Sequence, residues 1–415
     1  MHRLPSASMV LLLLLVLTGA AVAPLAAQDR PRNVILFIGD GVGASAWTAA
    51  KFASDALAVR ELRVMGLVDT RSSDSYITDS GAGATAYAAG VRTFNGAIGV
   101  GPDSNAVTTV LEIARDQGWA TGLVATSSVT HATPASFAAH VPSRASEFDI
   151  ARDLVANRVD VLLGGGTRYF DGRTRPDSVD LLARLRGTHA FVTLPQQLAG
   201  LDLGRTRRLV GLFAGTQMPS ARDRTPTLPE MTRAAIEVLS NDPDGFFLMV
   251  EGSQPDWRAH ANEPLEAVTA EMLDFDRAIG VAVEYRRRNP GTLIVVVADH
   301  ETGGLAIGLG RDSSRAAAAR ESIRATMMQL AATRSLLAPD QQPMMDSTLR
   351  ALAGTANRLA AVGRGGAISL VADYTSTGHS AQMVPLFAGG PGAERFAGII
   401  ENFEVGERLI ALVRR

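Results

Sequence analysis

Three continuous apolar runs, each closed by an acidic side chain, constrain the fold of this chain most. The runs cover residues 34–38, 246–250 and 293–298, and Asp40, Glu251 and Asp299 follow them within two residues. A strand without polar alternation is expected to be buried on both faces, as in a parallel sheet between helices. Since such sheets bind ligands at the carboxyl ends of their strands, we expect these carboxylates to meet at a site.

Other segments continue the same alternation of strands and helices. Further strands are predicted at 121–125, 159–163, 367–372 and 384–388, with helical segments between them. Residues 313–353 predict two helices separated near Pro339, whereas residues 167–224 show only loops and short elements. The alternation predicts an α/β fold, with a mostly parallel central sheet and helices on both faces. No linker or repeat divides the chain, so we expect residues 28–415 to form a single domain.

The composition limits the chemistry that this chain can carry. Its 415 residues have a net charge of −2, which gives no overall field for a nucleic-acid partner or an anionic membrane. Cysteine is absent, so disulfides and thiolate metal sites are excluded. A metal would need His, Asp, Glu or hydroxyl ligands, which suit zinc and magnesium.

The N-terminus has the pattern of a secretory signal peptide. Arg3 precedes an apolar run at 9–16, and small residues continue to Ala27. This pattern predicts a signal peptide over residues 1–27, removed after Ala27, and hence a periplasmic or secreted protein. The run is short for a membrane span, and we expect none after cleavage. An uncleaved anchor is the alternative.

A serine lies beside an acidic residue at the start of a small-residue segment. Asp79 and Ser80 begin a run rich in Ala and Gly that predicts a helix capped by one of the two. Backbone N–H groups and the helix dipole favour an anion there, which suits a phosphate. An ordinary capped, alanine-rich helix is the alternative explanation of these residues.

Four of the seven histidines lie near predicted strand ends or near an acidic residue. They are His131, His300, His379, and His260 one helical turn after Asp256. Carboxylates that meet at one sheet edge would repel one another unless a cation lay between them. The pattern therefore predicts a metal site.

These motifs, in this order, resemble those of the alkaline phosphatase family. They are Asp40-Gly41, Thr78-Asp79-Ser80, His131-Ala132-Thr133-Pro134, Glu251-Gly252, Asp256-x-x-x-His260, Asp299-His300-Glu301 and Gly378-His379. The resemblance covers roughly residues 33–304 and 374–388. It implies an alkaline-phosphatase-like fold, in which residues of about 310–373 form a helical surface insertion without a counterpart.

The resemblance also implies a function for each matching residue. A first zinc ion would bind Asp256, His260 and His379, and a second would bind Asp40, Asp299, His300 and the Ser80 oxygen. A third cation, usually magnesium, would share Asp40 and add Thr133 and Glu251. His131 stands beside this third site where some relatives have aspartate, and Trp257 stands where some have lysine. Ser80 would be the nucleophile, and Arg144, oriented by Asp79, would hold the phosphoryl oxygens.

The implied activity is hydrolysis of phosphomonoesters to inorganic phosphate and an alcohol through a phosphoserine. A phosphodiesterase or sulfatase of the same superfamily is one alternative, although Gly81-Ala82-Gly83 lacks the proline and arginine that a sulfatase nucleophile needs. An exported phosphate- or metal-binding protein is another, and the intact Ser80 argues against it. Members of the family are often homodimers, and the sequence leaves open whether this chain forms one.

Overall fold

A computed structural model describes residues 30–309, 313–334, 337, 341–361 and 370–414. The predicted signal peptide and Pro339 lie outside these described residues. Among the described helices, none is both long enough and apolar enough to cross a membrane.

A ten-stranded sheet forms the centre of the molecule. In the described chain, β13 is antiparallel to both of its neighbours and all other pairings of this sheet are parallel. In spatial order the strands are β14 (Gly398–Glu401), β2 (Val64–Asp69), β13 (Val384–Gly389), β8 (Thr292–Val297), β1 (Asn33–Gly39), β7 (Phe246–Gly252), β3 (Ala120–Ser128), β4 (Val161–Gly165), β6 (Leu209–Leu212) and β5 (Ala190–Val192). The predicted α/β fold with a mostly parallel sheet is thus confirmed.

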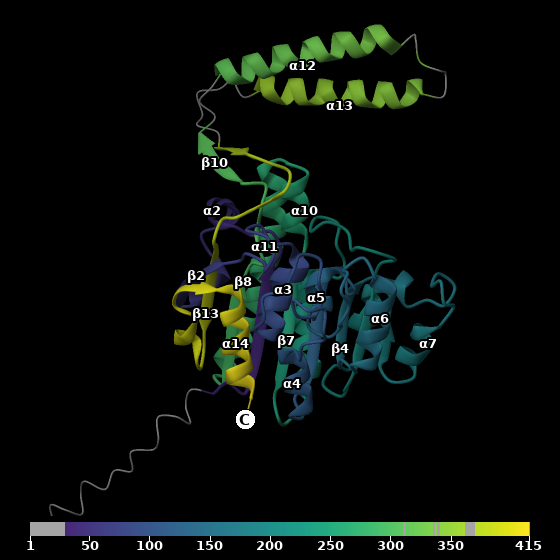
Figure 1. Cartoon of the computed structure of the whole chain (residues 1–415), viewed down its shortest axis with the longest axis vertical. Coiled ribbons are helices and arrows are strands. Elements are labelled where there is room, and N and C mark those ends of the chain that lie inside the picture. The colour runs from purple at the N-terminus through teal and green to yellow at the C-terminus, as the bar shows by residue number, and fades with distance from the viewer. Residues whose placement is uncertain (1–29, 310–312, 335–336, 338–340, 362–369, 415) are drawn as a thin grey trace, which may run out of the picture.

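Helices cover both faces of this sheet (Figure 1). One layer contains α2 (Ala44–Ala53), α9 (Leu228–Leu239) and α11 (Leu265–Arg288), and the other contains α3 (Ser80–Ala89), α4 (Val110–Asp116), α5 (Ala132–Ala135) and α14 (Asn402–Val413). The remaining helices are α6 (Glu147–Ala156), α7 (Leu181–Arg186), α8 (Pro195–Ala199), α10 (Gln254–His260), α12 (Ser313–Thr333) and α13 (Gln342–Ala361), with short 3-10 turns at 58–61, 167–169 and 393–396.

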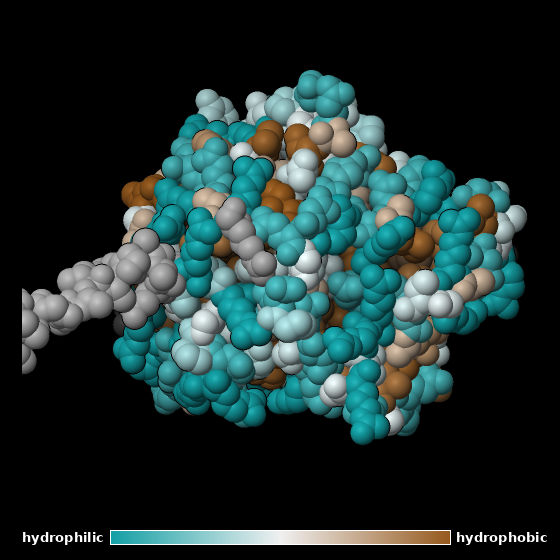
Figure 2. All heavy atoms as spheres, turned by 90° about the horizontal axis from the view of Figure 1, so that it is seen from below, coloured by the Kyte–Doolittle hydropathy of each residue, from teal (hydrophilic) through white to brown (hydrophobic). Residues whose placement is uncertain are grey.

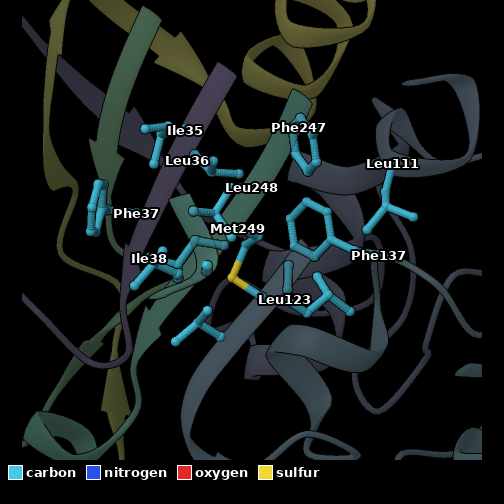
Figure 3. Close-up of a cluster of buried hydrophobic side chains, with 14 of the residues drawn as sticks. Ile35, Leu36, Phe37, Ile38, Leu111, Leu123, Phe137, Phe247, Leu248 and Met249 are labelled. Atoms are coloured by element: carbon cyan, nitrogen blue, oxygen red, sulfur yellow. The ribbon is translucent and has the colours of Figure 1, made fainter. Parts of the chain in front are cut away.

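The central strands are buried on both faces because their side chains contact both helix layers. Side chains of β1, β7 and β3 lie together in the core, where Phe137 stacks on Phe247 with ring centroids 6.0 Å apart (Figure 3). Every residue of β1 and β7 is buried. Burial of continuous apolar strands is a main source of stability for such a sheet. On the face seen from below in Figure 2, hydrophilic side chains predominate and apolar ones are scattered.

Two short antiparallel pairs lie outside the large sheet. β9 (Glu301–Thr302) pairs with β12 (His379–Ser380), and β10 (Ala306–Leu309) pairs with β11 (Leu370–Asp373). The helices α12 and α13 lie against each other beyond the β10–β11 pair, away from the large sheet (Figure 1).

Several sequence expectations differ from these elements. The strand expected at 367–372 is β11, which pairs with β10 and not within the large sheet. The short elements expected in residues 167–224 include β5 and β6, which join the large sheet, whereas neither β2 nor β14 was predicted. These strands are three to six residues long, too short to show a clear hydrophobic period, and tertiary pairing decides them.

A polar network joins α4 to the chain that follows α5. His140 Nε2 lies 2.9 Å from Glu112 Oε1, and His140 Nδ1 lies 2.6 Å from the Gly99 carbonyl oxygen. Glu112 also accepts hydrogen bonds from Thr109 N and Asn157 Nδ2. The hydrogen bond to Glu112 raises the pKa of His140. Although burial opposes it, the bonds from His140 and the other donors lower the pKa of Glu112 to about 2.

This network predicts a pH-dependent part of the stability. Since the pKa of His140 is raised in the folded state, its contribution is fully present below its unfolded pKa and declines as pH rises through the folded pKa. We expect His140→Gln to cost about 1 to 2 kcal/mol of unfolding free energy at pH 6. The cost should shrink progressively towards alkaline pH in urea unfolding curves.

His189 provides the matched control. Burial lowers its pKa, so the difference between parent and His189→Gln should change with pH in the opposite direction. A cost of His140→Gln that is the same from pH 6 to pH 9 would contradict a charged His140–Glu112 pair.

Candidate metal centre and phosphate site

The parallel strands carry acidic side chains to one edge of the sheet. Asp40 follows β1, Glu251 lies at the end of β7, and Asp299 follows β8. β1 lies between β8 and β7, and Ile38 pairs with both Glu251 and Val297. The three carboxylates therefore lie at the same height along the strands. The sheet register thus produces the convergence expected from the sequence.

The predicted ligands form three groups whose potential ligand atoms lie within 4.8 Å of one another. The first group is Asp256, His260 and His379; the second is Asp40, Asp299 and His300; the third is Asp40, His131 and Glu251. The second and third groups share Asp40. The structure therefore brings together every acidic and histidine residue that the sequence assigned to a metal.

The first group joins α10 to β12. Asp256 and His260 are one turn apart on α10, with His260 Nε2 3.2 Å from Asp256 Oδ1, and His379 Nε2 lies 3.1 Å from His260 Nε2. His260 Nδ1 lies 2.5 Å from the Thr377 carbonyl oxygen, and His379 Nδ1 lies 2.8 Å from that of Thr78. When Nδ1–H donates to these carbonyls, both Nε2 lone pairs face Asp256 and are free to bind a cation.

The second group surrounds the predicted nucleophile. His300 Nε2 lies 3.3 Å from Ser80 Oγ and 3.5 Å from both Asp40 Oδ1 and Asp299 Oδ2. All four residues are almost fully buried. Neither oxygen of Asp40, nor Asp299 Oδ2, has a hydrogen-bond partner among the described residues. Buried carboxylate oxygens without partners are costly, and a cation would compensate them.

The third group lies on the other side of Asp40. Glu251 Oε2 accepts a hydrogen bond of 3.1 Å from Ser127 Oγ, whereas Glu251 Oε1 and Thr133 Oγ1 have no partner among the described residues by distance and angle. His131 caps α5, and its ring meets that of Trp257 edge-on with centroids 6.0 Å apart. His131 thus both contacts Trp257 and offers a ligand atom to the third group.

Burial and mutual repulsion perturb the acidic groups. Burial, followed by the neighbouring carboxylates, raises the pKa of Asp40 well above its usual value and that of Asp299 to about 8. Burial likewise raises the pKa of Glu251 to about 7. Asp256 differs: burial raises its pKa, but the interactions with His260, His300 and Thr302 together outweigh burial and lower it. Divalent cations among these oxygens would remove the repulsion, so the residues present fit a metal centre.

Ser80 and Asp79 lie at the N-terminus of α3. Asp79 is the N-cap: its Oδ1 accepts hydrogen bonds from Ala82 N at 3.0 Å and Gly96 N at 2.9 Å, and its Oδ2 accepts from Arg144 Nη1 at 2.8 Å. Although burial opposes it, Arg144 and these N–H groups lower the pKa of Asp79. The guanidinium is therefore held in place near Ser80, where a phosphate would need it.

Two supporting residues gave no clear signal in the sequence. Glu147 accepts hydrogen bonds from Ser128, Thr130 and Tyr169, and so ties α6 to the loop that carries His131. Thr302 lies between Asp256 and His300. A helix-start glutamate and a strand threonine are common in any chain, and only their partners distinguish these two.

Comparison with known proteins decides the family. A sequence model described as alkaline phosphatase matches residues 31–414. The chain belongs to the alkaline phosphatase family. It is 34% identical to alkaline phosphatase 3 of Bacillus subtilis (strain 168), over 92% of this chain and 89% of that protein. As a member of this family it is a phosphomonoester hydrolase.

Solved alkaline phosphatases share the fold as well. The alkaline phosphatase of the Antarctic bacterium TAB5 is 34% identical, with a TM-score of 0.75, and the alignment covers 93% of this chain and 99% of that one. A mutant of the TAB5 enzyme, in which a histidine is replaced by aspartate, was solved with Mg bound in its M3 site and has a TM-score of 0.76 at 34% identity and the same coverage.

The contacts of Asp79 predict a graded loss of stability. Asp79→Ala removes the cap of α3 and the ion pair with Arg144, and we expect it to cost about 2 to 3 kcal/mol. Asp79→Asn keeps a side-chain oxygen for Ala82 N and Gly96 N, so it should cost roughly half as much. Urea unfolding of the metal-free proteins measures both. Equal costs for the two variants would show that the cap contributes nothing.

Proposed function

We propose that the chain hydrolyses phosphomonoesters through a covalent phosphoserine on Ser80. The site would hold two zinc ions and a third cation, with the residues of the three groups as their ligands. The observation that carries this proposal is the position of Ser80 Oγ, 3.3 Å from His300 Nε2 at the N-terminus of α3 and beside the shared Asp40. A serine at this point has cation ligands on one side and helix N–H groups on the other.

Each group has a proposed occupant. Asp256, His260 and His379 would hold the first zinc ion, and Asp40, Asp299, His300 and Ser80 Oγ the second. Asp40, Thr133 and Glu251 would hold the third cation, magnesium, with His131 beside them. Imidazole and carboxylate ligands suit zinc, and the oxygen-rich third group suits magnesium. When bound, the cations lower the pKa of a hydroxyl or water and balance the negative charge of phosphate.

The residues of the chain perform a double displacement. Ser80 Oγ loses its proton to solvent and forms a bond to phosphorus while the ester oxygen leaves with its electron pair. Water then attacks the phosphoserine, and Ser80 and inorganic phosphate are released. Arg144 presents two parallel N–H donors to the phosphoryl oxygens, and Asp79 keeps it oriented. N–H groups at the start of α3 favour the same negative charge.

Monoesters are favoured over diesters by the charge of the site. A monoester dianion offers more charged oxygens to Arg144 and to the cation groups than a diester does. Turnover of p-nitrophenyl phosphate should therefore exceed that of bis(p-nitrophenyl) phosphate. The reverse order would favour the phosphodiesterase alternative.

We also propose a location and a domain organisation. Residues 1–27 would be a signal peptide, which directs residues 28–415 to the periplasm or outside the cell as one domain. The insertion of about 310–373 would be peripheral to the chemistry. In support, its described helices lie beyond the β10–β11 pair and pack against each other, apart from the large sheet (Figure 1).

Removal of the nucleophile tests the proposed function. Ser80→Ala should lose at least a thousandfold of p-nitrophenyl phosphate turnover, because the proposed intermediate forms on the Ser80 hydroxyl. Its metal content, measured by plasma mass spectrometry, should stay near that of the parent. Parent protein quenched at acid pH with labelled phosphate should carry the label on Ser80. Label on another residue would refute the assignment.

The third group predicts the response to magnesium. Imidazole is a softer ligand than carboxylate and favours zinc, so His131 should leave magnesium weakly held. We expect added magnesium to activate the purified parent, and His131→Asp to reach full activity at a lower magnesium concentration. The Mg-bound TAB5 mutant with aspartate in place of a histidine supports this expectation. Identical activation curves for parent and variant would exclude His131 as a determinant of this site.

A further inference from the structure

Thr302 is a buried polar residue with no function in the mechanism above. Thr302 lies in β9, which follows directly after Asp299 and His300, and 1% of the residue is exposed. Its Oγ1 is 2.5 Å from Asp256 Oδ1 and 3.2 Å from His300 Nδ1. Asp256 belongs to the first group and His300 to the second, so one hydroxyl contacts both groups.

The chemistry of these three atoms fixes the direction of the hydrogen bonds. A carboxylate oxygen only accepts, so the Thr302 hydroxyl donates its single proton to Asp256. A separation of 2.5 Å is typical of a hydroxyl bound to a carboxylate. The hydroxyl can then only accept from His300, which requires the proton of the neutral imidazole to lie on Nδ1. His300 Nε2 is left with its lone pair towards Ser80 and Asp40.

The other two histidines of the metal centre are oriented differently. His260 and His379 each place Nδ1 against a backbone carbonyl, of Thr377 and Thr78. A backbone carbonyl is present whatever the side chain is. Among the histidines of the first and second groups, His300 is thus the one whose Nδ1 contacts a side chain and not a backbone carbonyl.

The turn after β1 is built around this hydroxyl. Gly41 has a φ of +72°, and a Cβ at this position would lie 2.8 Å from both Thr302 Oγ1 and Asp256 Cα. Thr302 N donates to the Gly41 carbonyl oxygen at 3.3 Å. Glycine meets both requirements, the positive φ and the close approach. The turn at Gly41, beside Asp40, thus packs against the Thr302 hydroxyl, which contacts both Asp256 and His300.

We propose that Thr302 is a positioning residue that links the first and second metal groups, by orienting Asp256 as an acceptor and His300 as the Nδ1–H tautomer. This inference rests on the proposed metal centre. Partners of this kind typically change metal affinity by 10- to 100-fold. Because one hydroxyl serves both groups, its loss should weaken both of them together.

Two substitutions isolate the hydroxyl. Thr302→Val keeps the volume and branching but has no hydroxyl, whereas Thr302→Ser keeps the hydroxyl and loses only a methyl group. Cobalt(II) is titrated into each metal-free protein, and its visible absorption and competition with a chelator give the affinity of each site. We expect Thr302→Val to lose on the order of 10- to 100-fold in affinity at both sites, and Thr302→Ser to stay within a few-fold of the parent.

The outcomes separate this proposal from the proposed function. A parent that binds no cobalt would refute the metal centre itself. If the parent binds cobalt and Thr302→Val matches it at either site, the link between the groups is refuted. The link is likewise refuted if Thr302→Ser is as weak as Thr302→Val, because the hydroxyl would then be irrelevant.

A measurement on the parent needs no variant at Thr302. The proposal requires the Nδ1–H tautomer of His300 in the metal-free protein at pH 8, before any cation binds. Nitrogen-15 NMR of histidine-labelled protein reports the tautomer, and the His300 signal is identified by its loss in His300→Gln. An Nε2–H tautomer would overturn the proposal even if Thr302→Val failed to fold.

Discussion

Mutual repulsion of buried carboxylates is the constraint on which the site depends. Asp40, Glu251, Asp256 and Asp299 are each at most 4% exposed and lie at one edge of the sheet. Such a cluster is unfavourable unless cations or protons neutralise it, and the raised pKa values of Asp40, Asp299 and Glu251 express this cost. Because these carboxylates repel one another, the packing of the rest of the fold must keep them close together.

The parallel sheet keeps the carboxylates close together, because burial of its apolar strands away from the site stabilises the fold. β8, β1 and β7 are buried along their whole length, so apolar packing holds them in position independently of the polar contacts of the site. The helix α3, which carries Ser80, packs against the residues that follow β8. A Cβ at Gly83 would lie 3.0 Å from the Asp299 carbonyl oxygen, and one turn later Tyr87 donates to the Ala298 carbonyl oxygen at 2.6 Å. This packing sets the short distance between Ser80 and His300.

The sheet places these side chains at its edge, and a second set of contacts orients them. Carbonyl oxygens orient His260 and His379, Thr302 orients His300, and Asp79 orients Arg144. These contacts come from loops and short strands far apart in the sequence. The proposed metal centre therefore depends on the assembled edge of the sheet, and a single segment could not form it.

The sequence by itself determined the strands that carry Asp40, Glu251 and Asp299, because long apolar runs between helices have few alternative folds. It also indicated a helix cap at Asp79 or Ser80 and the one-turn spacing of Asp256 and His260, since both are local. Tertiary structure decided the remainder. The short strands β2, β5, β6 and β14 form only because a longer neighbour pairs with them. Likewise, Thr302 contacts Asp256, 46 residues away, and Glu147 contacts Thr130, 17 residues away, and no local pattern records a contact over such a distance.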